Sequence, residues 1–153
     1  DLYHLKRISL SHNMIENLPA SIWDISSLER FNIKNNKLKF LPESIWNLSQ
    51  LRELELENNK IDVLPETIWN LFNLIRLSVS HNNLEVIPES IWDLFNLRII
   101  TLNNCNLKNL PQSLLKLKNL WVLDVRNNKP LYENLQAMTI INKLRADWVV
   151  VHI

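Results

Sequence analysis

The 153-residue chain contains no glycine, and this absence restricts both its turns and its chemistry. A glycine-rich loop that cradles phosphate groups is excluded, because such a loop depends on glycine at fixed positions. Turns that need a positive φ angle must use another residue, and asparagine tolerates that angle next best. Since asparagine is abundant in the sequence, we expect the turns to be built on asparagine.

Cysteine is nearly absent as well. Cys105 is the single cysteine, so a disulfide bond within the chain is excluded. No base near it in the sequence recommends it as a nucleophile, and we therefore expect a structural thiol. A lone thiol also favours a reducing, intracellular compartment over an oxidising one.

Long apolar runs, an excess of one charge and clustered metal ligands are also missing. The formal net charge is +1, which gives no argument for nucleic acid binding. No apolar run approaches the roughly 18 residues of a membrane-spanning helix. The four histidines are scattered, and no Cys/His spacing is typical of a metal site. We therefore expect no membrane span, metal, cofactor, small-molecule substrate or catalytic residue.

The feature that is present throughout is a repeat of 23 residues. Proline keeps this step, each time after an apolar residue, at Pro19, Pro42, Pro65, Pro88 and Pro111. Leucine keeps the same step at Leu5, Leu28, Leu51, Leu74, Leu97 and Leu120. A constant period of this size indicates one structural unit that is copied and stacked. Stacked units form a long concave surface rather than a pocket, which favours the binding of another macromolecule.

Each unit reads LxxLxLxxN, then xL, then LPxxIxxL. This pattern resembles the leucine-rich repeat over residues 2–131. The LPxxI half is similar to the intracellular, Ras-suppressor-like class, and secreted bacterial effectors carry repeats of the same general kind. The resemblance implies an α/β solenoid, a right-handed superhelix with a parallel sheet on its concave face. It also implies short helical or 3-10 turns on the convex face and, for a bacterial effector, the host cytoplasm after secretion.

The residue alternation in each repeat predicts which side chains face the core. Leu54 and Leu56 should point inward, while Glu53, Glu55 and Glu57 should point outward. The amides of one column should lie inside and bond the backbone groups that the turn leaves unpaired. This column consists of Asn13, Asn36, Asn59, Asn82, Cys105 and Asn128. The segment LPESIW should form one helical turn on the outer side, with its acidic residue at the positive end of the helix dipole.

Aromatic residues also fall into columns. Trp23, Trp46, Trp69 and Trp92 occupy one repeat position. We expect them on the outer flank as a stacked ladder, which would serve either as packing between units or as a second binding surface. Tyr3, Phe72 and Phe95 share another column, where we expect core residues.

The repeat ends after Leu131, which divides the chain into repeats over residues 1–131 and a C-terminal cap over residues 132–153. Leu135, Met138, Ile141 and Leu144 lie at helical spacing, and residues 147–153 are typical of a β-strand. The helix and strand are expected to form this cap. At the other end the sequence opens in the middle of a unit, so we expect a longer parent protein.

Strand residues that point away from the core recur at the same position of each repeat and so form outward columns along the stack. Three features of these columns distinguish the predicted binding face. Its N-terminal end is basic, its third unit is acidic, and its last units expose apolar residues. Arg30, Arg52 and Arg76 could instead neutralise the acidic cluster across strands, and the C-terminal cap could cover the apolar cluster. We predict that the partner contacts Arg30, Glu53, Glu55, Glu57, Arg76, Arg98, Ile99, Trp121, Val122, Asp124 and Arg126.

These observations favour a non-enzymatic module that binds another protein in a heteromeric complex. Trp121, Val122, Ile99 and Arg76 would anchor the partner, and the acidic third unit would set its orientation. A rigid curved surface also suits an inhibitor or regulator that covers a partner's active site. The alternative is the substrate-recognition domain of a larger effector enzyme, for example a ubiquitin ligase, whose catalytic part lies outside this sequence.

Overall fold

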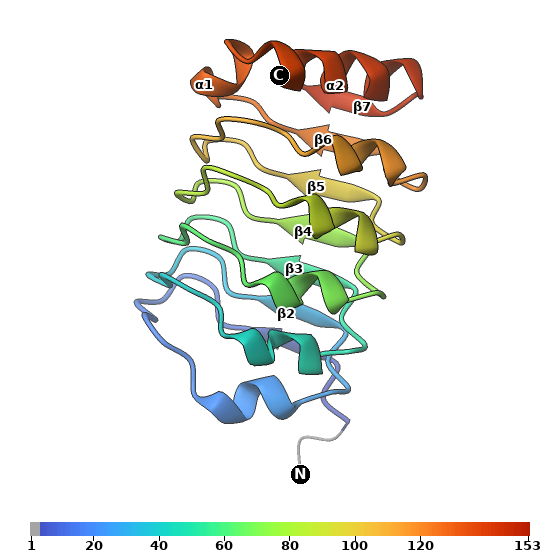
Figure 1. The fold of residues 1–153 in the computed structure, drawn as a ribbon. Helices are drawn as coiled ribbons and strands as arrows, with labels where there is room; N and C mark the ends of the chain where they lie inside the picture. Colours follow the sequence, from blue (N-terminus) through green and yellow to red (C-terminus); the bar gives the residue numbers. More distant parts are fainter. Residues whose placement is uncertain (1–3) are drawn as a thin grey trace.

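Each of the six repeats contributes one short strand and the C-terminal cap adds a seventh, and the strands pair in parallel in sequence order to form a single seven-stranded sheet (Figure 1). The strands are β1 (Arg7–Ser9), β2 (Arg30–Asn32), β3 (Glu53–Glu55), β4 (Arg76–Ser78), β5 (Ile99–Thr101), β6 (Val122–Asp124) and β7 (Val150–His152). The computed structural model describes residues 4–153, so Tyr3 of the Phe72 column lies outside the described residues. Equivalent positions of neighbouring repeats are paired, for example Arg30 with Glu53. The stacked parallel sheet confirms the predicted solenoid.

A 3-10 helix in each of the first five repeats returns the chain toward the next strand. These helices are η1 (Ala20–Asp24), η2 (Glu43–Asn47), η3 (Glu66–Asn70), η4 (Glu89–Asp93) and η5 (Gln112–Lys116). Each begins directly after the recurring proline, whose φ angle lies between −64° and −75°. Proline fixes such an angle and lacks the N–H that a helix start would leave unpaired. The predicted helical turn on the outer side is therefore confirmed.

The sheet and the 3-10 helices enclose a continuous apolar core. Leu54 and Leu77 reach it from the strands and Ile45 and Ile68 from the helices, and all four are fully buried. Burying one such side chain stabilises the fold by about 2 kcal/mol. Because each repeat is covered only by its neighbours, this stabilisation depends on the stack.

The predicted asparagine column lies inside and joins consecutive repeats from Asn36 onward, whereas Asn13, at the less covered first repeat, is exposed, contrary to the prediction. Asn59 donates through Nδ2 to the carbonyl oxygens of Ile33 and Leu56, both at 3.0 Å. Its Oδ1 accepts from the backbone N–H of Leu38 at 3.0 Å. Equivalent bonds are made by Asn36, Asn82 and Asn128. These amides satisfy backbone groups that the turn leaves unpaired, as expected.

Cys105 substitutes for asparagine in this column. Its Sγ donates to the carbonyl oxygen of Val79 at 3.3 Å, which is the position that an asparagine Nδ2 uses in the other repeats. The residue is fully buried, and burial raises the pKa of the thiol to about 11. A neutral, buried thiol is a poor nucleophile. The reducing compartment inferred from this residue stays a prediction.

Six residues with positive φ angles make the turn that follows each strand of the repeats. They are His12, Asn35, Asn58, His81, Asn104 and Asn127, with φ between 53° and 60°. Asparagine and histidine are among the few residues besides glycine that adopt this region with little penalty. Turns built on asparagine are thus confirmed, and histidine fills the position in two repeats.

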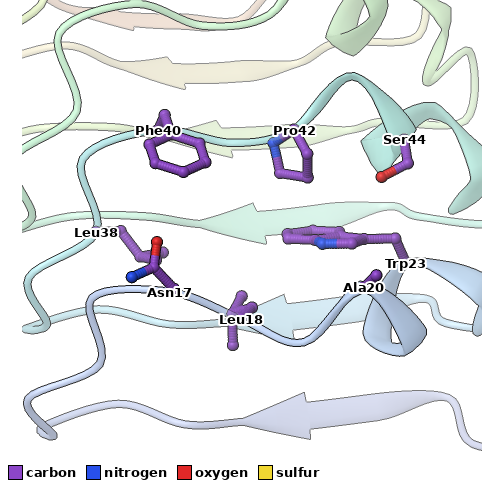
Figure 2. Close-up of a pocket in the computed structure, with 8 residues that line it drawn as sticks. All are labelled: Asn17, Leu18, Ala20, Trp23, Leu38, Phe40, Pro42 and Ser44. Atoms are coloured by element: carbon purple, nitrogen blue, oxygen red, sulfur yellow. The ribbon is translucent and has the colours of Figure 1, made fainter.

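The four tryptophans of one column do not form the predicted outer ladder. Trp23 and Trp69 are buried, at 3% and 1% exposed, whereas Trp46 and Trp92 are 51% and 47% exposed. Figure 2 shows the indole of Trp23 between two successive return segments, beside Pro42. The outer position is therefore wrong for two members of the column.

Uneven packing of the 3-10 helices explains this alternation. Helix η2 packs more extensively against η3 than against η1, and η4 packs more extensively against η5 than against η3. The looser pairs are the ones whose first helix carries a buried indole, Trp23 or Trp69. Trp46 and Trp92 lie on the first helix of each more extensively packed pair, and both remain exposed.

The Phe72 column is exposed, contrary to the prediction of core residues. Phe72 and Phe95 are 48% and 55% exposed, and their rings stack with centroids 6.2 Å apart. They lie in the tight turn between each 3-10 helix and the next strand. A turn at the surface cannot bring these side chains into the core.

The C-terminal segment folds into α1 (Lys129–Tyr132), α2 (Leu135–Ala146) and β7. In Figure 1, α2 lies across the end of the stack. It buries Ala137, Ile140, Ile141 and Leu144. Leu135, expected on this buried face, is 83% exposed, because it precedes Ala137 by two residues and so points to another side of the helix. Within residues 4–153, no helix combines the length and apolarity needed to cross a membrane.

Candidate interaction surface

The in-register pairing of the strands places equivalent side chains side by side on the concave face. The first strand positions are Arg7, Arg30, Glu53, Arg76, Ile99, Val122 and Val150. The third positions are Ser9, Asn32, Glu55, Ser78, Thr101, Asp124 and His152. The predicted contact residues all lie in these columns or in the adjoining ones. Their role in binding a partner stays a prediction.

The N-terminal half of this face pairs its charges internally. Arg30 Nη2 lies 3.2 Å from Glu53 Oε1. Lys34 Nζ lies 3.2 Å from a carboxylate oxygen of Glu55 and 3.2 Å from one of Glu57. All three carboxylates of the acidic cluster are therefore ion-paired across strands with two cations, and Lys34 rather than Arg52 or Arg76 supplies the second cation.

A further ion pair lies beside this half. Lys6 Nζ donates to Glu29 Oε1 at 2.7 Å. This hydrogen bond holds the pKa of Glu29 below its ordinary value. The charged half also contains a hollow of about 340 Å³, lined by residues of β1, β2 and β3 including Arg7, Arg30 and Glu53.

The C-terminal half presents apolar side chains instead. Trp121 is 59% and Val150 is 53% exposed, and Ile99 and Val122 are partly exposed. The guanidinium carbon of Arg98 lies 4.7 Å from the centroid of the Trp121 ring, in a cation–π contact. Tryptophan and arginine are among the residues most enriched in the binding hot spots of protein interfaces.

The C-terminal cap does not cover this apolar cluster. Strand β7 continues the sheet beside β6, with Val122 paired to Val150 and Asp124 to His152. The cap therefore lengthens the concave face by one strand. Cap burial, the competing explanation for the apolar cluster, does not hold.

Asp124 and Arg126 form a two-pronged ion pair at this end. Arg126 Nη2 donates to Asp124 Oδ2 at 2.6 Å, and Nε donates to Oδ1 at 3.0 Å. Burial alone would raise the pKa of Asp124, but the hydrogen bonds from Arg126 outweigh it and hold the pKa below the ordinary value. The same contact raises the pKa of Arg126. Both residues are thus charged and mutually satisfied at neutral pH.

Val150 and His152 also belong to this face, although neither was predicted to lie there. The signal was available, because Val149 and Val151 are buried while the residues between and after them face outward. This is the alternation expected of a half-buried strand. Which strand β7 would pair with could not be read from that pattern.

The sequence was also compared with known protein families. A family model described as "Leucine rich repeat" matches residues 4–61 and 49–107, which together cover more than half of the chain. No curated protein matches the sequence with significant similarity.

Solved structures of similar shape come from bacteria and plants. A leucine-rich-repeat protein of Leptospira interrogans matches 99% of this chain and 44% of its own, with a TM-score of 0.77 and 28% identity. An internalin of Listeria monocytogenes matches 99% of this chain and 42% of its own, with a TM-score of 0.82 and 23% identity.

A plant structure matches a smaller part of the chain. The ectodomain of the Arabidopsis thaliana receptor kinase GASSHO1/SCHENGEN3, solved in complex with CASPARIAN STRIP INTEGRITY FACTOR 2, matches 79% of this chain and 15% of its own. Its TM-score is 0.73 and its identity 30%. The chain thus spans less than half the length of each of these three proteins.

Proposed function

Because the chain belongs to the leucine-rich-repeat family, we propose that it is a protein-interaction module whose concave face binds a partner protein. The observation that carries this proposal is the uncovered apolar cluster of Ile99, Trp121, Val122 and Val150. Exposed apolar patches of this kind mark interaction sites. Support also comes from the plant receptor ectodomain of the same fold, which was solved with a bound factor.

The size of the face suits an ordinary protein interface. Seven strands at a spacing of about 4.8 Å span roughly 29 Å. A standard interface buries about 800 Å² on each partner. The apolar cluster would form its dry centre, and the ion pairs of Arg30, Lys34 and Arg126 would form a polar rim.

We expect the module to act as a regulator or inhibitor of its partner in a heteromeric complex. A rigid surface loses little conformational entropy on binding, so it can hold a partner in one orientation. The test is to add the purified chain to the partner's own activity assay. Activity that is unchanged at saturation would leave a binding role and refute an inhibitory one. The role of recognition domain in a larger effector enzyme stays an alternative prediction.

The binding face can be tested with matched valine substitutions. V122E/V150E places two charges in the apolar cluster, while V63E/V86E places two charges at exposed valines outside it, which are 65% and 59% exposed. Partners captured from cells by the wild-type chain would be identified by mass spectrometry and then purified for calorimetry. We expect V122E/V150E to weaken binding at least 100-fold and V63E/V86E to leave it within twofold.

Two results would contradict the proposal. One is equal affinity of V122E/V150E and the wild type for the purified partner. The other is loss of binding in V63E/V86E alone, which would move the interface to another part of the surface. Circular dichroism and thermal midpoints of both variants show whether each remains folded.

A further inference from the structure

Four residues directly before β3, β4, β5 and β6 form a second ordered row, which we call the pre-strand row: Arg52, Ile75, Arg98 and Trp121. Backbone hydrogen bonds fix their positions. The N–H of Ile75 donates to the Arg52 carbonyl at 2.8 Å, that of Arg98 to Ile75 at 2.9 Å, and that of Trp121 to Arg98 at 2.8 Å. The row therefore presents cation, apolar, cation and aromatic side chains at steps of about 4.8 Å.

A groove of about 250 Å³ runs along the first three residues of this row. It is lined by Arg52, Ile75 and Arg98 together with Asn73, Asn96 and Asn119. Each asparagine donates through Nδ2 to a backbone carbonyl of the preceding repeat, at 2.8 to 2.9 Å. These bonds hold the amides in place, so the wall of the groove is preformed.

The charges left unpaired around the row are positive. Within residues 4–153, Glu29, which lies directly before β2, and each carboxylate of the concave columns already lie in ion pairs; those of the columns are Glu53, Glu55, Glu57 and Asp124. Arg52, Arg76 and Arg98 have no carboxylate within ion-pair distance among the same residues. A chain of net charge +1 thus presents a locally cationic groove.

We propose that the pre-strand row binds an acidic segment of the partner protein. In this segment two carboxylates about 10 Å apart pair with Arg52 and Arg98, an apolar side chain between them contacts Ile75, and an aromatic one reaches Trp121. The inference rests on the protein-binding function proposed above and adds the chemistry of the partner. Charge complementarity of this kind sets orientation and speeds association.

The order of side chains makes the proposal testable with peptides. A displayed random-peptide library would be selected on the wild-type chain and counter-selected on R52Q/R98Q, which removes both charges without adding new ones. We expect the enriched peptides to carry two acidic residues and an aromatic one. Synthetic, fluorescein-labelled versions should bind R52Q/R98Q about 10-fold more weakly by fluorescence anisotropy, and should bind the wild type more weakly at 500 mM than at 50 mM salt.

K39Q/K60Q is the matched control. It removes the same charge from two exposed lysines outside the groove and should change the affinity less than twofold. Selection of peptides without acidic residues, failure to enrich any peptide, or equal loss in both variants would overturn the proposal. So would equal competition by a poly-dT oligonucleotide of the same charge, since the row would then recognise polyanions in general.

The two proposals fail in different ways. If V122E/V150E abolishes binding of the purified partner while R52Q/R98Q binds it normally, the proposed binding by the concave face is supported and the proposed recognition of an acidic segment is refuted. If R52Q/R98Q weakens binding and V122E/V150E does not, the apolar cluster is not the interface. Thermal midpoints within about 2 °C of the wild type would show that exposed Arg52 and Arg98 contribute nothing essential to folding.

Discussion

The first repeat (residues 5–27) and the fourth repeat (residues 74–96) follow the same apolar pattern but bury it differently. Ile8 and Leu10 of the first repeat are only partly buried, whereas Leu77 and Val79 at the equivalent positions are fully buried. The fourth repeat has a neighbour on each side among the described residues, and the first has one. Burial is therefore a property of the position in the stack, and substitutions at equivalent positions should differ in their effects.

The largest difference should come from the strand core. Leu77→Ala should lower the free energy of unfolding by about 3 kcal/mol, because it leaves a cavity among fully buried neighbours. Ile8→Ala should cost about 1 kcal/mol, because the site is partly solvated before the change. Urea unfolding of both variants, followed by far-UV circular dichroism and tryptophan fluorescence, measures the two values.

Coincidence of the two optical transitions is the control in that experiment, since a solenoid can lose its cooperativity when one unit is weakened. Equal losses in the free energy of unfolding for Leu77→Ala and Ile8→Ala would contradict the difference in burial between the two repeats. They would mean that the first repeat is covered as well as the fourth in solution.

A smaller difference should appear in the asparagine column. Asn59→Ala removes bonds to three buried backbone groups of two repeats and should cost about 2 kcal/mol. Asn13→Ala removes only two exposed bonds, to the carbonyls of Leu10 and Ser11, and should cost about 0.5 kcal/mol. Thermal unfolding at one protein concentration ranks the stability losses of the two variants. A larger loss for Asn13→Ala would contradict the conclusion that the asparagine column joins consecutive repeats.

The smallest difference concerns two carboxylates with lowered pKa values. Since the folded-state pKa of Asp124 lies below its ordinary value, its charge stabilises the fold above about pH 4, and this contribution is lost as the pH falls below that. At pH 7, Asp124→Asn should cost less than about 1 kcal/mol. Glu29→Gln, which removes an exposed partner of Lys6, should have no measurable effect.

Unfolding measured from pH 7 to pH 3 separates the two carboxylates. The difference between the wild type and Asp124→Asn should shrink toward the acid end. A difference that stays constant over this range would show that the substitution acts through packing rather than through charge.

The repeat pattern was sufficient to predict the sheet, the 3-10 turns and the asparagine column. Each depends on backbone geometry that recurs every 23 residues, such as proline before a helix and leucine alternation within a strand. The pattern was also sufficient to place the outward columns, because in-register pairing follows from a constant period. These features are local to one repeat and its nearest neighbour.

Features that depend on how two repeats differ could not be predicted in this way. Trp23 and Trp46 share a repeat position, yet one is buried and the other exposed, and this difference follows an alternation in how extensively successive 3-10 helices pack against each other. Lys34 pairs with Glu55 and Glu57 through a side-chain direction that the sequence does not specify. The extension of the binding face by Val150 required knowing that β7 joins the sheet.

The hydrogen bonds of the asparagine column also determine how the molecule responds to force. Asn59 fastens its own turn to Ile33 of the preceding repeat, so tension between the two ends of the chain would load such rungs in series. The first described repeat is less covered than the others, so it should unfold first, and the remaining repeats should unfold one after another. Unfolding of one repeat would add 23 residues of extended chain, about 80 Å in length. Optical tweezers would therefore record increases in extension of equal size.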